Sequence, residues 1–170
     1  MNLKYIKEKV KTLKENYPGS SALDLLHHFK VVTYFFDDSL ESELPEGCYF
    51  KIDGIKFVFI DANLSDEDRK RVYAHELGHV LLHPDINTLE VEKYDPVLYE
   101  KLEKEAETFA AEFLLDDDVF MKYFTSCNYK IASHEKVPVR YVNMKVNNLD
   151  KSVRKDYEQF FAMNPHYISY

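Results

Sequence analysis

Cysteine is scarce in this sequence, no apolar run is long enough to cross a membrane, and positive charge is not in excess. Cys48 and Cys127 are too few to form a disulfide framework, and two thiols suit a reducing compartment. A membrane helix needs about 20 consecutive apolar residues, and the N-terminal residues lack the apolar core and cleavage site of a signal peptide. We therefore expect a cytoplasmic protein that does not associate with membranes.

The formal net charge is −8. The acidic excess lies within residues 1–120, whereas residues 121–170 carry a slight basic excess. An acidic body repels the phosphate backbone of nucleic acids, so direct DNA or RNA binding is not expected. The basic C-terminal part could meet an acidic protein partner, although simple solvation is the plainer interpretation.

The chain has 170 residues, of which 45% are hydrophobic and 15% aromatic, and this is enough for one folded domain with a sizeable core. We predict a domain over residues 1–120, with its core motifs in residues 20–120. Residues 121–170 are predicted to form a helical extension packed on the same domain. Helical and strand patterns are mixed along the chain, which predicts the α+β class.

One short motif, His75-Glu76-Leu77-Gly78-His79, points to metal chemistry. On a helix, a spacing of four residues puts His75 and His79 one turn apart on the same face, where both rings can reach one metal ion. Glu76 lies about 100° round the helix from His75. There it can act as a general base toward water, but it is poorly placed to be a ligand.

The neighbours of this motif decide between a metal site and a chance match. A pattern with three fixed positions also occurs by accident on exposed helices. Here the residues between and after the histidines are small or apolar, so the helix is expected to be buried. A buried glutamate beside two histidines needs a compensating partner, and a metal ion is the simplest one.

Three stretches rich in β-branched and aromatic residues predict a small sheet, namely residues 31–36, 48–52 and 55–60. Asp53-Gly54 joins the last two as a two-residue hairpin turn, which needs positive φ at both positions. We predict a mainly antiparallel three-stranded sheet packed on helices. The loop 37–47 and the hairpin could bind substrate backbone as an added strand, or the hairpin could be purely structural.

Helices are predicted around this sheet from apolar residues at helical spacing and from capping residues. Ser65 can cap the helix of the motif, which should run from about Asp66 to His83 and stop at Pro84. A second long helix should open at Pro96, with a loop over residues 85–94 before it. Other helices are expected at residues 2–16, after Ser20 or Ser21 through Phe29, after the acids 116–118, at 137–149 and at 150–163.

A catalytic zinc site takes three protein ligands and keeps one position for water, so two histidines require a third donor. The second long helix carries the acids Glu100, Glu103, Glu105, Glu107 and Glu112. Glu103 and Glu107 share a face with Ala106 and Ala110, whose small side chains would allow close approach to the helix of the motif. The metal site is therefore predicted between two helices, whereas Glu105 and Glu112 are expected to point toward solvent.

The motif with Leu81-Leu82-His83, followed by Glu103-Lys104-Glu105-Ala106-Glu107-Thr108-Phe109-Ala110, resembles the ImmA/IrrE metallopeptidases, which are bacterial and phage proteins of the gluzincin type. The second motif of that family is Glu-x-x-Ala-(Asn or Asp)-x-Phe-Ala. The resemblance implies that Glu103 is the third ligand and that Glu107 supports a ligand histidine, although Asn or Asp is usual there. A longer acid could accept a ring N–H or compete as a ligand.

Further residues are candidates for contacts around the metal. His83 continues the row of histidines, but it lies two turns from His75, roughly 12 Å along the axis, so both cannot bind one ion. We expect His83 to contact substrate or to make a hydrogen bond. Hydrolysis also needs a second donor to the oxyanion, and the candidates are Tyr73, His83, His134 and Tyr141.

The resemblance implies a zinc-dependent endopeptidase that cleaves a regulatory protein, a helix-turn-helix repressor of a phage or mobile element, and so acts as an anti-repressor. Zinc follows from the donor types, and Mn²⁺ or another divalent ion would suit them as well. Two alternatives are a metal-stabilised module that inactivates a repressor without cutting it and a metal-sensing regulator. Glu76 distinguishes them, because hydrolysis needs its carboxylate and a structural site does not.

Overall fold

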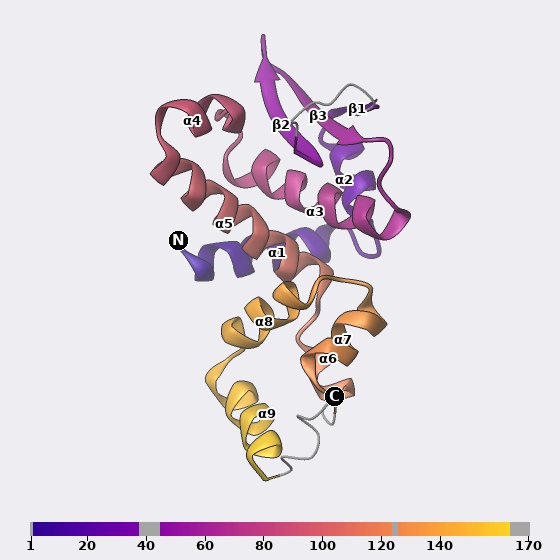
Figure 1. Ribbon diagram of the computed structural model, residues 1–170, viewed down its shortest axis with the longest axis vertical. Helices are drawn as coiled ribbons and strands as arrows, with labels where there is room; N and C mark the ends of the chain where they lie inside the picture. The colour runs from indigo at the N-terminus through magenta and orange to yellow at the C-terminus, as the bar shows by residue number, and fades with distance from the viewer. Residues whose placement is uncertain (1, 38–44, 124–125, 164–170) are drawn as a thin grey trace. The chain divides into compact units, whose positions relative to one another are not determined.

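The computed structural model describes residues 2–37, 45–123 and 126–163 and shows an α+β fold (Figure 1). Contacts divide the chain into two compact units, residues 1–110 and 111–170. None of the helices in the described ranges has the length and apolar character needed to span a membrane. The helices are α1 (Leu3–Asn16), α2 (Ala22–His28), α3 (Asp66–Leu82), α4 (Thr88–Tyr94), α5 (Pro96–Leu114), α6 (Asp118–Lys122), α7 (Asn128–Glu135), α8 (Val139–Asn148) and α9 (Lys151–Met163).

The sheet of the first unit is mixed. Its strands are β1 (Val32–Phe36), β2 (Gly47–Ile52) and β3 (Ile55–Asp61). Their order is β1-β3-β2, with β3 antiparallel to β2 and parallel to β1. The sequence predicted a mainly antiparallel sheet, and the parallel pair is the difference. Alternation of apolar residues has a period of two in either kind of pair, so it does not reveal strand direction or which strands are neighbours.

The hairpin between β2 and β3 forms as predicted. Asp53 has φ 49° and Gly54 has φ 80°, the two positive values that a two-residue turn needs. This turn pairs Ile52 with Ile55, so alternate residues of β2 bond to β3 and the residues between them direct their amide groups outward. Residues 38–44 of the loop expected to bind substrate lie outside the described part of the chain.

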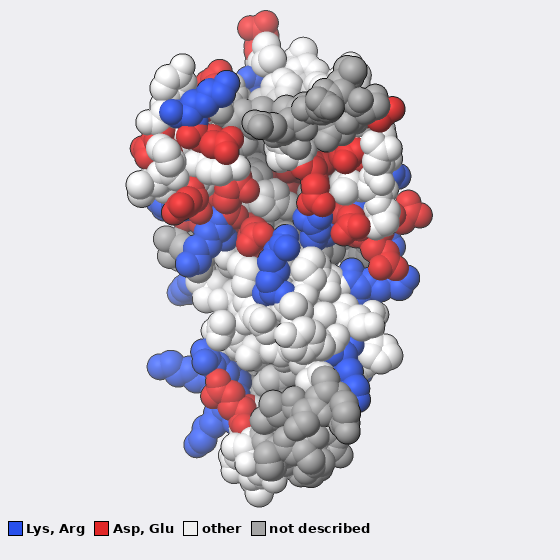
Figure 2. All heavy atoms as spheres, in the orientation of Figure 1, with Lys and Arg blue, Asp and Glu red and all other residues white. Residues whose placement is uncertain are grey.

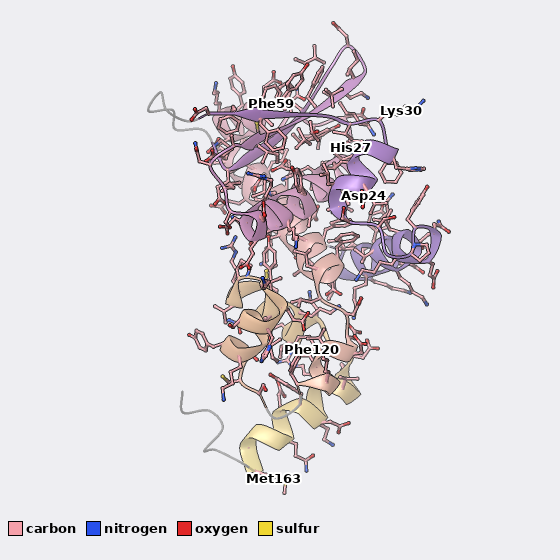
Figure 3. The ribbon with its side chains drawn as sticks, turned by 90° about the vertical axis from the view of Figure 1, so that its right-hand side faces the viewer. Asp24, His27, Lys30, Phe59, Phe120 and Met163 are labelled. Atoms are coloured by element: carbon pink, nitrogen blue, oxygen red, sulfur yellow. The ribbon has the colours of Figure 1, made fainter. Side chains whose placement is uncertain are left out.

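The two faces of the sheet have different surroundings. Tyr49, Val58 and Ile60 are fully buried on the face that packs on α2 and α3. The opposite face carries stacked aromatic rings of Tyr34, Phe50, Phe57 and Phe59. Figure 3 shows Phe59 at the sheet, with Asp24 and His27 on α2 below it.

Helix α2 begins at the predicted cap. The Ser21 hydroxyl accepts the Asp24 N–H, and the Asp24 carboxylate accepts the Ser21 N–H. His27 and His28 occupy the last turn, as expected of helix-end residues. The ring of His28 lies 4.5 Å from that of Tyr17, and Nε2 of His27 lies 3.4 Å from the Thr33 hydroxyl oxygen.

Two helices were not predicted. Residues 85–94 were expected to be a loop, but Thr88–Tyr94 form α4, and α7 occupies Asn128–Glu135. Both segments are short and have weak apolar periodicity. Whether such segments form helices depends on their contacts with the rest of the protein. For example, the Asn87 side chain before α4 accepts the Lys51 N–H of β2 (2.8 Å).

The second unit encloses an ionic cluster as well as an apolar core. The ammonium of Lys145 on α8 pairs with the carboxylates of Glu112 and Asp117, and Lys145 and Glu112 are both 3% exposed. Glu112 was expected to face solvent, and this was wrong. Phe120 lies among the helices of this unit in Figure 3 and packs edge-on against Tyr157, with 5.6 Å between ring centroids.

Candidate metal centre

Helix α3 presents both histidines of the motif on one side. The Ser65 hydroxyl caps the helix by accepting the Asp68 N–H (3.1 Å), and the acids of the first turn complement the positive end of the helix. The helix ends at Leu82, one residue earlier than predicted. The rings of His75 and His79 have centroids 4.8 Å apart, as a spacing of one turn requires.

Helix α5 lies against α3 because small residues meet at their contact. A Cβ added to Gly78 would lie 3.1 Å from Cα of Ala106 and 3.3 Å from Cβ of Phe109. Close approach at Ala106 was predicted from its small side chain and is confirmed. The two helices are thus near enough for acids of α5 to reach histidines of α3.

Three side chains converge between these helices: His75, His79 and Glu103. Nε2 of His75 lies 3.2 Å from Oε2 of Glu103, and Nε2 of His79 lies 3.2 Å from Oε1 of the same carboxylate. The two Nε2 atoms are 3.1 Å apart. The structure therefore brings together the three donors named from the sequence.

The spacing of these donors fits a divalent ion of the zinc type. Donor atoms about 2.0–2.2 Å from a tetrahedral ion lie roughly 3.3 Å from one another. The two Nε2 atoms are 3.1 Å apart, each lies 3.2 Å from a different oxygen of Glu103, and one donor atom from each of the three residues lies within 4.8 Å of the others. Two imidazoles and one carboxylate also form the three-ligand set of a catalytic zinc site, whereas structural sites use four protein ligands. The residues present therefore fit such an ion.

Glu76 is enclosed beside the three donors. It is 2% exposed, and its Oε2 atom is buried without a hydrogen-bond partner among the described residues. Burial raises the pKa of Glu76 to about 7, despite the opposite effect of His75. An unpartnered buried carboxylate is costly to keep. Its place beside metal-ligand donors indicates a role in the site.

Strand β2 begins directly on Glu76. A Cβ added to Gly47 would lie 2.9 Å from Oε1 of Glu76 and would overlap Cγ1 of Val72. Only glycine lets the backbone of β2 approach this closely. The start of β2 therefore covers the carboxylate and helps to keep it buried.

Comparisons with known proteins identify the family of this chain. Residues 26–147 match a peptidase family described as the IrrE N-terminal-like domain. The chain belongs to the ImmA/IrrE family of metallopeptidases. A member of this family is expected to use a divalent metal ion, and the cluster on α3 and α5 is a possible site for it.

This chain is similar to two curated proteins. It is 31% identical over 125 residues to "Uncharacterized immunity region protein 2" of Bacillus phage phi105, across 69% of this chain and 73% of the phage protein. It is 33% identical over 96 residues to "Metallopeptidase ImmA" of Bacillus subtilis (strain 168), across 54% of this chain and 56% of ImmA. The second match therefore spans little more than half of ImmA.

The charges of this ImmA/IrrE site suit a cation. Burial acts to raise the pKa of Glu103, but hydrogen bonds to His75 and His79 lower it to about 2. Burial lowers the pKa of His79 to about 4. For His75, burial is outweighed by the hydrogen bond to Glu103 and by the nearby carboxylates, so its pKa is raised. At neutral pH an ion would meet an ionised Glu103 and a neutral His79, and would compete with a proton at His75.

His83 stands behind the donors of the family motif. It is the C-cap residue of α3 and is 5% exposed. Its Nδ1 lies 3.2 Å from Nδ1 of His79, and its Nε2 lies 3.1 Å from Oε2 of Glu105. Of the two roles expected for His83, the structure shows the hydrogen bond, and the partner is a candidate ligand.

Glu105 was expected to face solvent, and this was wrong. Its side chain is 17% exposed and contacts His83. The sequence analysis assigned too few positions of α5 to its buried face. Leu102 and Phe109, three residues before and four residues after Glu105, are 4% and 0% exposed. Their spacing continues one buried stripe through Glu105, and this signal in the sequence could have identified it.

The remaining candidates occupy different surroundings. Glu107 lies near enough to His75 to contribute to its raised pKa. Tyr73 is 6% exposed and lies roughly 160° round α3 from His75, so it does not join the donors. Tyr141 and His134 belong to the second unit, where Tyr141 is fully buried and His134 stacks on Tyr123 at 5.2 Å.

Tyr99 was missed by the sequence reasoning. It lies one turn before Glu103 on the same face of α5 and is partly buried. Burial raises the pKa of Tyr99 to about 12, with contributions from Glu103, Glu92 and Glu76. Its hydroxyl therefore stays protonated at neutral pH. Its spacing from Glu103 was the available signal.

Proposed function

We propose that this chain is a zinc-dependent endopeptidase that hydrolyses a peptide bond in a regulatory protein. His75, His79 and Glu103 would hold the ion, and Glu76 would be the general base. The observation that carries this proposal is the buried carboxylate of Glu76, which has an unpartnered oxygen beside three donors of metal-ligand type. A purely structural metal site has no use for such a group.

When bound, the zinc ion would polarise the scissile carbonyl and activate a water molecule for attack. Glu76 takes the proton that leaves this water as the new C–O bond forms. It then delivers the proton to the amide nitrogen as the C–N bond breaks, which lets the amine depart. A carboxylate beside the reacting groups suits both steps, because it can accept the proton of the water and then release it to the leaving amine.

Tyr99 is our candidate for the second donor to the oxyanion. Both ring nitrogens of His83 are already engaged, and Tyr73 lies on another face of α3. The Tyr99 hydroxyl remains a donor at neutral pH and shares a helix face with Glu103. A donor that strengthens its hydrogen bond as negative charge develops lowers the barrier to hydrolysis.

The edge of β2 that faces away from β3 would bind the main chain of the substrate. Gly47 and Tyr49 direct their backbone groups away from β3, and Gly47 lies against Glu76. An extended peptide could pair with these groups as an added strand. Farther along this edge, the Asn87 side chain already accepts a hydrogen bond from the Lys51 N–H. The paired segment would therefore be short and would end at Asn87.

The proposed substrate is a helix-turn-helix repressor, whose cleavage would switch on repressed genes. The names of the two relatives support this choice, since one is an immunity region protein of a phage and the other is ImmA. Figure 2 shows acidic side chains gathered over α4, α5 and the start of α3. A repressor carries basic residues for DNA phosphates. The opposite charges would favour encounter between the two proteins.

A cleavage assay with wild type and Glu76→Gln tests the proposal. Each protein is first quantified for bound zinc, and the substrates are helix-turn-helix repressors encoded beside the gene. We expect both proteins to hold zinc and only the wild type to cut. If both hold zinc and relieve repression but neither cuts, the chain is a binding module. Relief of repression that follows the zinc concentration without cleavage would identify a metal-sensing regulator.

A further inference from the structure

We propose that His83 and Glu105 form a hydrogen-bonded relay that fixes His79 in the one tautomer able to bind a metal ion through Nε2. This inference rests on the metal site of the proposed function and adds two positioning residues to it. Neither residue touches the three donor atoms of the centre directly. Both act through the second nitrogen of His79.

The orientation of the His79 ring is the first step. Its Nε2 faces the donor cluster, 3.1 Å from Nε2 of His75 and 3.2 Å from Oε1 of Glu103. Its Nδ1 faces the opposite way and lies 3.2 Å from Nδ1 of His83. The two sides of one imidazole therefore serve different partners, so the state of one nitrogen determines that of the other.

The positions of the protons follow from this orientation. Binding through Nε2 needs a lone pair there, so a neutral His79 must carry its proton on Nδ1. That N–H can donate only if Nδ1 of His83 is an acceptor, which puts the His83 proton on Nε2. The Nε2–H then points at the Glu105 carboxylate, 3.1 Å away. With an ion bound at Nε2 of His79, each of the two relay contacts thus has one donor and one acceptor.

Burial makes this arrangement restrictive. His79 and His83 are 2% and 5% exposed, and the side chain of Glu105 is 17% exposed. Water therefore has little access to replace a lost partner. His83 is held in place because its backbone N–H donates to the His79 carbonyl (2.8 Å) where α3 ends. The backbone therefore holds His79 and His83, the first pair of the relay, in fixed positions.

The relay also separates the roles of two acids on α5. Glu107 lies on the side of His75, where its charge adds to the larger effects of Glu103 and Glu76 on the pKa of that ring. Glu105 acts on His79 through His83. A carboxylate that accepts the outer N–H of a ligand histidine, directly or through a second ring, orients it and increases its basicity. His79 should therefore bind zinc more strongly than an unsupported imidazole.

Zinc affinity measured by chelator competition at pH 7 tests the relay. His83→Leu and Glu105→Leu remove the two acceptors, and we expect each to raise the zinc dissociation constant roughly 10–100-fold. His83→Gln and Glu105→Gln keep an acceptor oxygen and should recover most of the loss. Glu100→Leu, at an exposed position of the same helix, is the control. Leucine variants that bind zinc within threefold of this control would overturn the relay.

A second measurement needs no variant. In zinc-loaded wild type with ¹⁵N-labelled histidine, NMR should show protons on Nδ1 of His79 and on Nε2 of His83. A proton on Nδ1 of His83 would contradict the relay. Failure of the proposed function is distinguishable, because a zinc-loaded wild type that cuts no repressor would still give these affinities and spectra. Conversely, normal cleavage with zinc affinity unaffected by the leucine variants rejects the relay alone.

Discussion

Gly78 of α3 lies directly against Ala106 of α5, so that a methyl group on Gly78 would come within 3.1 Å of the Ala106 Cα and 3.2 Å of its carbonyl oxygen. The candidate ligands are divided between these helices, with two histidines on α3 and Glu103 on α5. The three donors can meet only while the helices stay this close. The small residues of the contact therefore help to bring the candidate ligands together.

Gly78→Ala is expected to weaken both the fold and zinc binding. Alanine favours a helix more than glycine by about 1 kcal/mol, but the added methyl must push α5 away, at a cost of about 1–3 kcal/mol. The separation would also draw Glu103 from the two histidines and raise the zinc dissociation constant. Urea denaturation and chelator competition measure the two effects. Lys70→Ala, at an exposed position of α3, is the control. A more stable Gly78→Ala with unchanged zinc affinity would contradict this view.

Gly47→Ala should impair catalysis more than zinc binding. The new Cβ would overlap Val72 and lie 2.9 Å from Oε1 of Glu76, so the carboxylate must shift. The three atoms nearest to this methyl group belong to Val72 and Glu76, and none belongs to a candidate ligand. We expect a large fall in kcat for repressor cleavage, with zinc content retained. An unchanged kcat would show that the position of Glu76 does not depend on the start of β2.

Tyr99→Phe tests the proposed oxyanion donor. The ring and its packing are kept, and only the hydroxyl is lost. Removal of one such donor lowers kcat roughly 10²–10³-fold, whereas KM and zinc affinity should stay within threefold of the wild type. Tyr94→Phe is the control, because Tyr94 is 86% exposed on α4. If Tyr99→Phe raised KM at constant kcat, Tyr99 would instead bind the substrate equally in the ground state and the transition state.

The parts of the site that could be predicted are those set by local spacing. A four-residue interval brings two histidines to one face of any helix, so His75 and His79 needed no knowledge of the fold. Ser65, Pro84 and Pro96 likewise marked helix boundaries through their own backbone chemistry. Glu103 depended on the small residues Ala106 and Ala110, and on the family motif. These signals lie within single elements.

The parts that were missed depend on contacts between elements. The parallel pairing of β1 with β3 has no signal in strand alternation. The contact of Glu105 with His83 joins two different helices, and Glu112 is buried because Lys145 of α8 neutralises it. From the sequence alone, an acid on a helix is predicted to be exposed unless its partner is known. The relay and the ionic cluster of the second unit therefore appear only in the structure.

The pH dependence of stability gives a direct test of the environment of Glu76. Its pKa is raised from 4.5 to about 7 by burial, so the folded protein holds a proton between these pH values that the unfolded chain releases. The contribution of Glu76 to the free energy of unfolding therefore falls as pH rises through this window. Glu76→Gln cannot ionise and lacks this slope.

We expect Glu76→Gln to gain stability relative to the wild type as pH rises from about 5 to about 8 with a chelator present. Urea denaturation at several pH values measures the difference. His75 and His79 are common to both proteins, but the charge of Glu76 contributes to the raised pKa of His75, so the difference reports Glu76 together with its coupling to His75. Added zinc should remove the trend, because a cation beside the carboxylate favours its ionised form. A difference that does not vary with pH would mean that Glu76 is solvated, and the buried general base would lose its physical basis.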